Sequence, residues 1–182
     1  MAFSTIIALT AIASVPGAPL QTARTQTTEY RNEQAKKAEG KPLPFFSLLR
    51  LDDSTVTNAD IRGKVAVIHF YRISGPRCQV SLDRLQALHS EFASQGLVVV
   101  AATLSEPANR RTDPPKESLS AFLRAQSYAF TFAYNADELA RDWKVPAMPT
   151  SFVVGRDGVV REVLIGVNDA RMRELVPNLL AH

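Results

Sequence analysis

The sequence predicts an α/β domain in which helices flank a central mixed β-sheet. Two runs rich in β-branched residues, 65–71 and 97–104, are apolar throughout, as is typical of strands buried on both faces. A helical pattern lies between them, and a strand–helix–strand unit of this kind forms a parallel pair with a right-handed crossover. Residues 151–154 and 159–165 flank Gly155-Arg156-Asp157-Gly158, which predicts an antiparallel hairpin and makes the sheet mixed.

The first 40 residues are expected to precede this domain. Residues 3–15 are apolar and are followed by small residues, which predicts a signal peptide over residues 1–18. The stretch is too short to span a bilayer, which takes about 20 apolar residues. It lacks the Lys or Arg usual at the start of a signal, so a disordered, Ala-rich terminus is the alternative. Residues 19–40 are polar without apolar periodicity and predict a linker or a frayed helix.

The domain itself is expected over residues 41–182. Residues 46–51 and 55–57 flank Asp52-Asp53-Ser54 and predict a small amino-terminal β-hairpin extension. The long helix after the first central strand is expected to run to about Ser94, and Gly96 is a typical helix terminator. One face of that helix is apolar, and it carries Cys78, Leu82, Leu85, Leu88 and Phe92 in helical phase.

The remaining elements are shorter. The sequence predicts, in order, an exposed proline-rich loop at 107–116, a helix at 117–126, an apolar stretch at 130–134 and a helix at 136–143. Asn168 is expected to cap a last helix, which Pro177 should kink or end.

Composition excludes several classes of function. The chain has 182 residues, enough for one ordinary domain, and a net charge of +3, too small to indicate a nucleic-acid partner. A single cysteine excludes an intrachain disulfide and a thiolate-rich zinc site. The three histidines are not spaced as metal ligands, and no nucleotide-binding motif is found. We therefore expect no metal, no cofactor and no nucleic acid.

Two segments carry a resemblance to a known family. Residues 63–78, GKVAVIHFYRISGPRC, resemble the strand-to-helix active-site segment of thioredoxin-like redoxins of the TlpA/ResA and AhpC/TSA types. Residues 145–152, VPAMPTSF, resemble the cis-proline segment of these proteins, and the predicted hairpin follows it. The resemblance extends over residues 41–180. It implies a thioredoxin fold and an ancestry among thiol-disulfide oxidoreductases.

The sequence departs from this family at Gly75. The family's turn carries Cys-x-x-Cys, whose first cysteine lies at a helix N-terminus that stabilises its thiolate. Counting back from Cys78, Gly75 occupies the position of that nucleophilic cysteine. Without its sulfur the protein has no internal disulfide to close, so ordinary dithiol exchange should be absent.

The resemblance makes Cys78, His69 and Glu106 the candidate catalytic residues. His69 lies where related thioredoxins keep a buried acid, and Glu106 follows the second strand, where the TlpA/ResA group often has a glutamate. If the imidazole reaches Cys78, a thiolate–imidazolium pair would activate the sulfur as a monothiol that forms mixed disulfides or a sulfenic acid. The alternatives are an inert buried thiol, a hydrogen-bonded strand histidine and a solvated loop carboxylate.

The resemblance also implies a substrate groove formed by Gly75, Pro76, Met148 and Pro149. Pro149 is expected to be cis, with the Met148 backbone free to pair with an extended substrate. Protein thiols, disulfides or extended peptide segments are then the expected partners. The oligomeric state is left open.

Three functions follow. The first is a redoxin with a degenerate motif that acts at most through the lone Cys78. The second is a redox-silent binding or chaperone-like module that keeps the groove around Pro149. The third is a single-cysteine peroxidase. The protein is expected outside the cytoplasm, periplasmic or secreted, if residues 1–18 are a signal peptide, and in the cytoplasm otherwise.

Overall fold

The computed structural model describes residues 20–106 and 115–182. The predicted signal peptide and most of the proline-rich loop lie outside these residues. None of the helices within the two described ranges is both long enough and apolar enough to cross a membrane.

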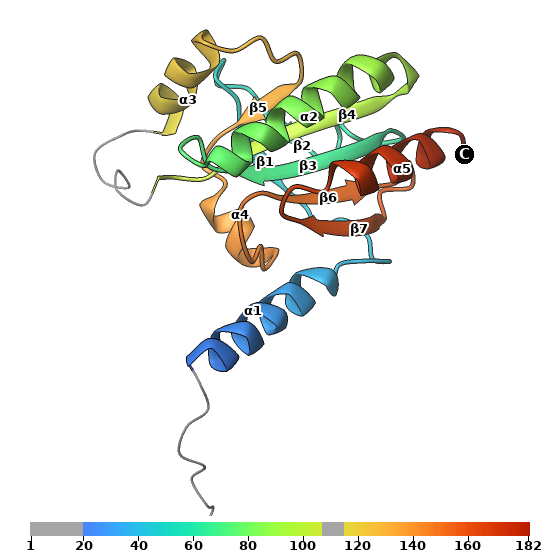
Figure 1. Ribbon diagram of the computed structural model, residues 1–182. Coiled ribbons are helices and arrows are strands. Elements are labelled where there is room, and N and C mark those ends of the chain that lie inside the picture. Colours follow the sequence, from blue (N-terminus) through green and yellow to red (C-terminus); the bar gives the residue numbers. More distant parts are fainter. Residues whose placement is uncertain (1–19, 107–114) are drawn as a thin grey trace, which may run out of the picture.

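Five strands form the central sheet in the order β5-β4-β3-β6-β7 (Figure 1). They are β3 (Val65–Tyr71), β4 (Leu97–Thr103), β5 (Thr131–Ala133), β6 (Thr150–Val154) and β7 (Val160–Ile165). The pairs β3–β4 and β4–β5 are parallel, whereas β3–β6 and β6–β7 are antiparallel. Every residue of β3 is buried, which explains why this strand is apolar at consecutive positions. The predicted mixed sheet is confirmed.

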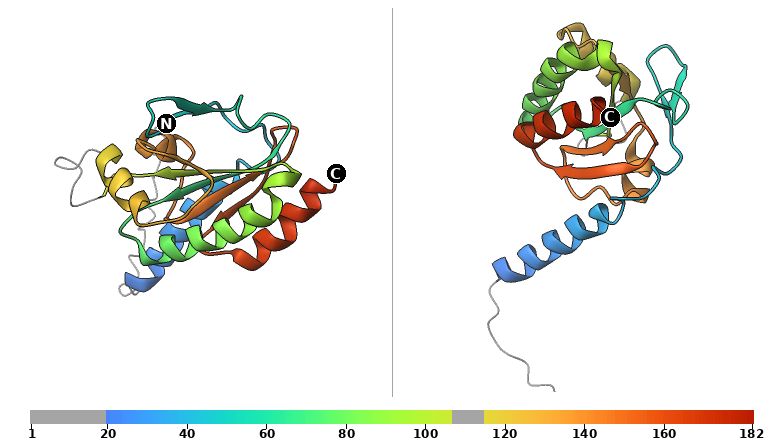
Figure 2. Two further views of the ribbon diagram at one scale, coloured as in Figure 1. Left: turned by 90° about the horizontal axis from the view of Figure 1, so that it is seen from above. Right: turned by 90° about the vertical axis from the view of Figure 1, so that its right-hand side faces the viewer.

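Different elements pack on the two faces of the sheet. One is packed by α2 (Pro76–Phe92), α3 (Pro115–Arg124) and α5 (Asp169–Leu180). The other is packed by α4 (Asp137–Asp142) and by the hairpin of β1 (Ser47–Leu49) and β2 (Thr55–Thr57). In the left view of Figure 2 the sheet lies between this hairpin and the helices α2 and α5. Because side chains alternate along a strand, β3 contributes to both layers of the core.

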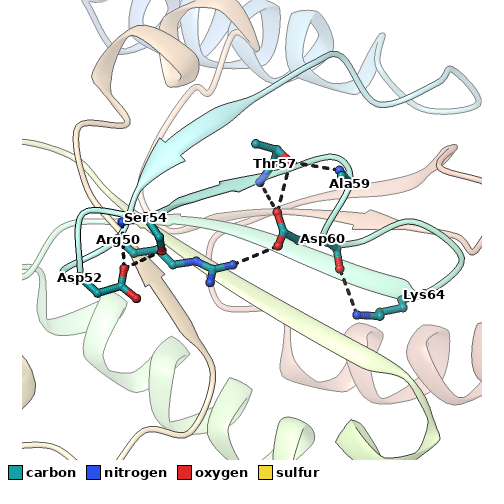
Figure 3. A network of polar contacts seen from close by, with 7 residues as sticks. All are labelled: Arg50, Asp52, Ser54, Thr57, Ala59, Asp60 and Lys64. Atoms are coloured by element: carbon teal, nitrogen blue, oxygen red, sulfur yellow. Dashed lines mark hydrogen bonds and ion pairs between the residues drawn. The ribbon is translucent and has the colours of Figure 1, made fainter.

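A network of polar contacts fixes the predicted hairpin extension (Figure 3). Asp60 accepts hydrogen bonds from the Thr57 amide at 2.7 Å and from Arg50 at 3.3 Å. Asp52 accepts one from the Ser54 amide at 3.1 Å, which closes the turn between β1 and β2. Lys64 donates to the Asp60 carbonyl at 3.1 Å and so links the network to the start of β3. These contacts have a structural role, since they join residues of the hairpin and of the turn that follows it to one another.

The segment expected as a linker or frayed helix is ordered as α1 (Leu20–Lys36). Its amino-terminal part extends away from the domain, whereas its last turn packs on it, with Ala35 only 1% exposed (Figures 1 and 2). Beyond the helix, Gly40 donates to the Val160 carbonyl at 2.8 Å and the Glu39 carboxylate accepts from Val163 at 2.9 Å. Tertiary contacts with β7 therefore order a segment whose sequence has no apolar periodicity.

The last helix differs from expectation at both ends. Asn168 is at the N-cap position, but its side chain donates to the Ile165 carbonyl at 2.7 Å and makes no capping bond. Pro177 does not end the helix, which continues to Leu180. Pro177 lies within the last turn, so the one hydrogen bond that it removes, to the carbonyl four residues earlier, affects only the end of the helix. Gly96 ends the α2 region with φ +99°, as predicted.

Candidate functional site

The candidate site begins where the chain leaves β3 and turns into α2. Gly75 is the N-cap residue and Pro76 the first helical residue, a position where the missing amide of proline costs nothing. The Gly75 carbonyl accepts hydrogen bonds from Cys78 at 2.8 Å and from Gln79 at 3.1 Å. The φ of Gly75 is −81°, so its backbone conformation does not itself require glycine.

The side chain missing at Gly75 would contact Cys78. A Cβ built on Gly75 would lie 2.9 Å from the sulfur of Cys78 and 3.4 Å from its Cβ. In disulfides the two Cβ atoms are about 3.5–4.5 Å apart, so position 75 lies about where a disulfide-bonded neighbour of Cys78 would stand. The geometry agrees with the sequence-based assignment of Gly75 to the first-cysteine position.

Cys78 is held as a protonated thiol. It is 2% exposed, and the Arg72 amide is 3.5 Å from its sulfur. Burial raises the pKa of the Cys78 thiol; the Arg72 amide opposes this effect, and the negative charge of Glu106 adds to it. The environment therefore favours the inert alternative over the activated monothiol.

His69 is bound to Ser151, not to the thiol. The two residues face each other across β3 and β6, and the His69 Nδ1 lies 2.8 Å from the Ser151 hydroxyl oxygen. Complete burial lowers the pKa of His69 to about 3, so the imidazole is neutral at physiological pH. Its Nε2 has no hydrogen-bond partner among the described residues. These contacts differ from the expected thiolate–imidazolium pair, which needs a charged imidazole beside an ionised Cys78.

Glu106 holds the turn in place. Its carboxylate accepts hydrogen bonds from the Ser74 amide at 3.1 Å and from the Ser74 hydroxyl. Glu106 is therefore not the freely solvated loop carboxylate that was the alternative. It also makes no hydrogen bond to Cys78 among the contacts of the described residues. The contact joins the segment after β4 to the turn before α2.

A second set of contacts ties the turn to α4. The Arg72 guanidinium donates to the Ser105 carbonyl. The Ser105 amide and hydroxyl donate in turn to Asp137, at 3.0 and 2.8 Å. Sequence analysis did not identify these residues, because they belong to three elements and no local spacing relates them. Their one sequence signal was that Arg72 and Ser105 directly follow neighbouring parallel strands.

The Met148–Pro149 peptide bond is cis, as predicted. Phe70 is opposite Thr150 in the β3–β6 register, which places Pro149 beside the end of β3 and the turn that follows it. The Met148 amide and carbonyl make no hydrogen bond within the described part of the chain. The resemblance therefore selected a segment that is next to the turn and has free backbone groups.

An open pocket of about 510 Å³ joins the turn to the cis-proline segment. Arg72 and Met148 both line it, together with Asp137 and Arg141 of α4. Over residues 20–106 and 115–182, no three His, Cys, Asp or Glu side chains come together as metal ligands would. The site thus combines free backbone groups at Met148 with a thiol at Cys78 that is buried and has a raised pKa.

Comparisons with known proteins agree with this geometry. The model of the AhpC/TSA family matches residues 40–163. The chain is 24% identical over 142 residues to the thiol-disulfide oxidoreductase ResA of Geobacillus kaustophilus, covering 76% of each chain. It is 26% identical over 136 residues to the thiol:disulfide interchange protein DsbE of Pseudomonas aeruginosa, covering 73% of this chain and 69% of that one.

The fold is shared with solved thioredoxin-family structures. A thiol:disulfide interchange protein of the thioredoxin family from Chlorobium tepidum superimposes with a TM-score of 0.64 at 23% identity. The match covers 76% of this chain and 95% of that one. The domain thus has the thioredoxin fold, with the β1–β2 hairpin as an amino-terminal extension.

Proposed function

Because this chain belongs to the AhpC/TSA family, we propose that it is a redoxin that binds extended protein segments without internal disulfide chemistry. Its relatives include thiol-disulfide oxidoreductases, and its own motif is degenerate, with Cys78 as the lone cysteine. Such a protein would still bind the polypeptide substrate of a thiol-disulfide oxidoreductase. It would lack the pair of cysteines that carries out the exchange.

One contrast carries the proposal. The thiol of Cys78 is buried with a raised pKa, whereas the backbone of Met148 beside it is free to pair. Met148 precedes β6, an interior strand of the sheet, so a peptide laid along it would pair with the free backbone groups of this loop and not with an edge strand. Main-chain hydrogen bonds would then give affinity, and side-chain pockets would give specificity. The pocket between Arg72 and Met148 supplies room for one such side chain.

A monothiol function of Cys78 is the second candidate, and one observation favours it. Gly75 places no side chain over the sulfur, so a small movement of the turn would uncover it. In that case the Cys78 thiolate attacks a partner disulfide, a new S–S bond joins the two proteins, and the partner's other sulfur leaves as a thiolate. Protein thiols and disulfides are the partners of this alternative.

We also place the protein outside the cytoplasm, periplasmic or secreted. The support is the sequence of residues 1–18, with its apolar run and the small residues that follow. Exclusion of the mature protein from the cytoplasmic fraction would test this, as would sequencing of its amino terminus.

A thiol-blocked, unfolded protein is the decisive probe, because it offers extended segments but no disulfide chemistry. Isotope-labelled protein should show amide shifts at Met148 and Thr150 when this probe is added. Met148→Glu replaces an apolar side chain of the pocket with a charge that a bound peptide would have to desolvate, and should weaken binding about tenfold. Ala93→Glu, exposed at the far end of α2, should bind as the unsubstituted protein does.

Two outcomes of this experiment would count against the proposal. Absence of binding, or equal loss in both variants, would refute a groove at Met148. Capture of only those probes whose thiols are left unblocked would favour the monothiol alternative.

A further inference from the structure

A second pocket, of about 400 Å³, lies between α1 and the segment that joins α4 to the cis-proline turn. Tyr30 and Arg31 of α1 line one side, and Arg141, Lys144 and Val145 line the other. In Figure 1 this is the region where α1 passes below α4. Its volume falls in the range of about 300–1,000 Å³ that small-molecule sites occupy.

The charged residues that line this pocket are all basic. Arg31, Arg141 and Lys144 all line it, and no carboxylate does. None of the three forms an ion pair with another described residue, so their charges are not neutralised by a direct contact. The carboxylates of Asp137 and Glu138 line the neighbouring pocket together with Arg141 and do not line this one. Three cations that line one pocket create a positive potential there, which an anion would neutralise.

Several of the remaining lining residues are apolar or aromatic. The Tyr30 side chain is 63% exposed, one of few large hydrophobic side chains that the described surface presents to solvent. Ala140, Val145 and Pro146 line the same pocket from α4 and the segment after it. A ring and an aliphatic wall beside three cations suit a ligand that carries an anionic group on an apolar body.

We propose that this pocket binds an amphipathic anion, a carboxylate or phosphate attached to an aromatic or aliphatic body. The anionic group lies among Arg31, Arg141 and Lys144, and the body packs between Tyr30 and Val145. Because the lining residues belong to α1 on one side and to α4 and the segment after it on the other, the bound ligand holds α1 against the domain.

Phenylbutyrate and phenyl phosphate, titrated into the isotope-labelled full chain, test the proposal. Amide shifts should concentrate in residues 30–34 and 140–146. The neutral analogue phenylbutanamide should bind about fivefold more weakly, the effect of losing one charge contact near the surface. Arg31→Gln and Lys144→Gln should weaken both anions to a similar degree. Lys36→Gln, exposed on the same helix and outside the pocket, should have no effect.

Two outcomes would overturn the proposal. One is equal binding of phenylbutyrate and its neutral amide, since the cations would then play no part. The other is binding that Arg31→Gln and Lys144→Gln leave unchanged. Binding of only one of the two anions supports the site and identifies which headgroup it prefers. Thermal unfolding of each variant shows that any loss is not a loss of folding.

Discussion

The sulfur of Cys78 lies 2.9 Å from the point at which a Cβ on Gly75 would stand. The absent side chain and the remaining thiol are thus immediate neighbours, although two residues separate them in the sequence. The thiol that remains is buried in the hydrophobic core, with the Arg72 amide 3.5 Å from its sulfur. Substitutions at either Gly75 or Cys78 can therefore test the proximity of the two positions.

Gly75→Ala should destabilise the fold by about 1 kcal/mol, because its Cβ would overlap the Cys78 sulfur. The backbone at Gly75 is compatible with alanine, so the cost comes from this contact. Cys78→Ala in the same chain should relieve it, and urea unfolding of the two single variants and the double variant would give a favourable coupling energy. Additive effects would mean that the two positions do not touch.

Gly75→Cys should restore a pair of cysteines, and the new cysteine should form a disulfide with Cys78. The built Cβ is 3.4 Å from the Cβ of Cys78, just short of the usual disulfide range and within reach of a small backbone adjustment. The folded variant is reduced or mildly oxidised and its thiols are then titrated in urea, which should find two thiols after reduction and none after oxidation. Gly75→Ser, which fills the same space without a second sulfur, serves as the control. Persistence of both thiols under oxidation would show that the turn no longer has redoxin geometry.

Cys78 should react slowly with iodoacetamide at neutral pH in the folded protein and rapidly in urea. Its thiol is buried and its pKa is raised by that burial, so the nucleophilic thiolate is scarce. The folded state also binds the thiol proton more tightly than the unfolded chain does. Stability should therefore fall as pH rises through the unfolded thiol's pKa of about 8.5.

Fast alkylation below neutral pH would instead support the monothiol function. A sulfenic acid trapped after brief exposure to peroxide, and lost in Cys78→Ser, would support the peroxidase alternative.

Glu106→Gln should raise the alkylation rate of Cys78 modestly. The carboxylate is one of the causes of the raised thiol pKa, and its removal favours the thiolate. Because the amide still accepts a hydrogen bond from Ser74, the turn should keep its conformation. Glu106→Ala, which loses that bond as well, should in addition cost about 1 kcal/mol of stability. An unchanged rate in both variants would remove Glu106 from the electrostatics of the site.

The folded state should lose stability as pH falls from about 6.5, by up to about 1.4 kcal/mol per pH unit. Burial lowers the pKa of His69 to about 3, so between these values the unfolded chain binds a proton that the folded chain excludes. Urea unfolding across this range measures the slope, which His69→Gln should flatten. His89, whose pKa burial also lowers, contributes in the same direction, so His89→Gln is the matched comparison. A slope unchanged by His69→Gln would show that the ring is not excluded from protonation.

The sequence determined the class and order of the elements. The apolar run of β3, the glycine that ends the α2 region and the turn between β6 and β7 are local patterns, and a local pattern decides local structure. The resemblance of residues 145–152 to a known segment also predicted the cis bond before Pro149.

The tertiary structure decided what the site residues do. His69 and Ser151 meet because β3 and β6 pair in one register, and Glu106 reaches Ser74 across parallel strand ends. The burial that keeps Cys78 protonated and His69 neutral depends on how α2 and the sheet pack together. Such contacts join residues distant in the chain, so their energies depend on distance and desolvation in the folded protein, which the spacing of residues in a sequence does not specify.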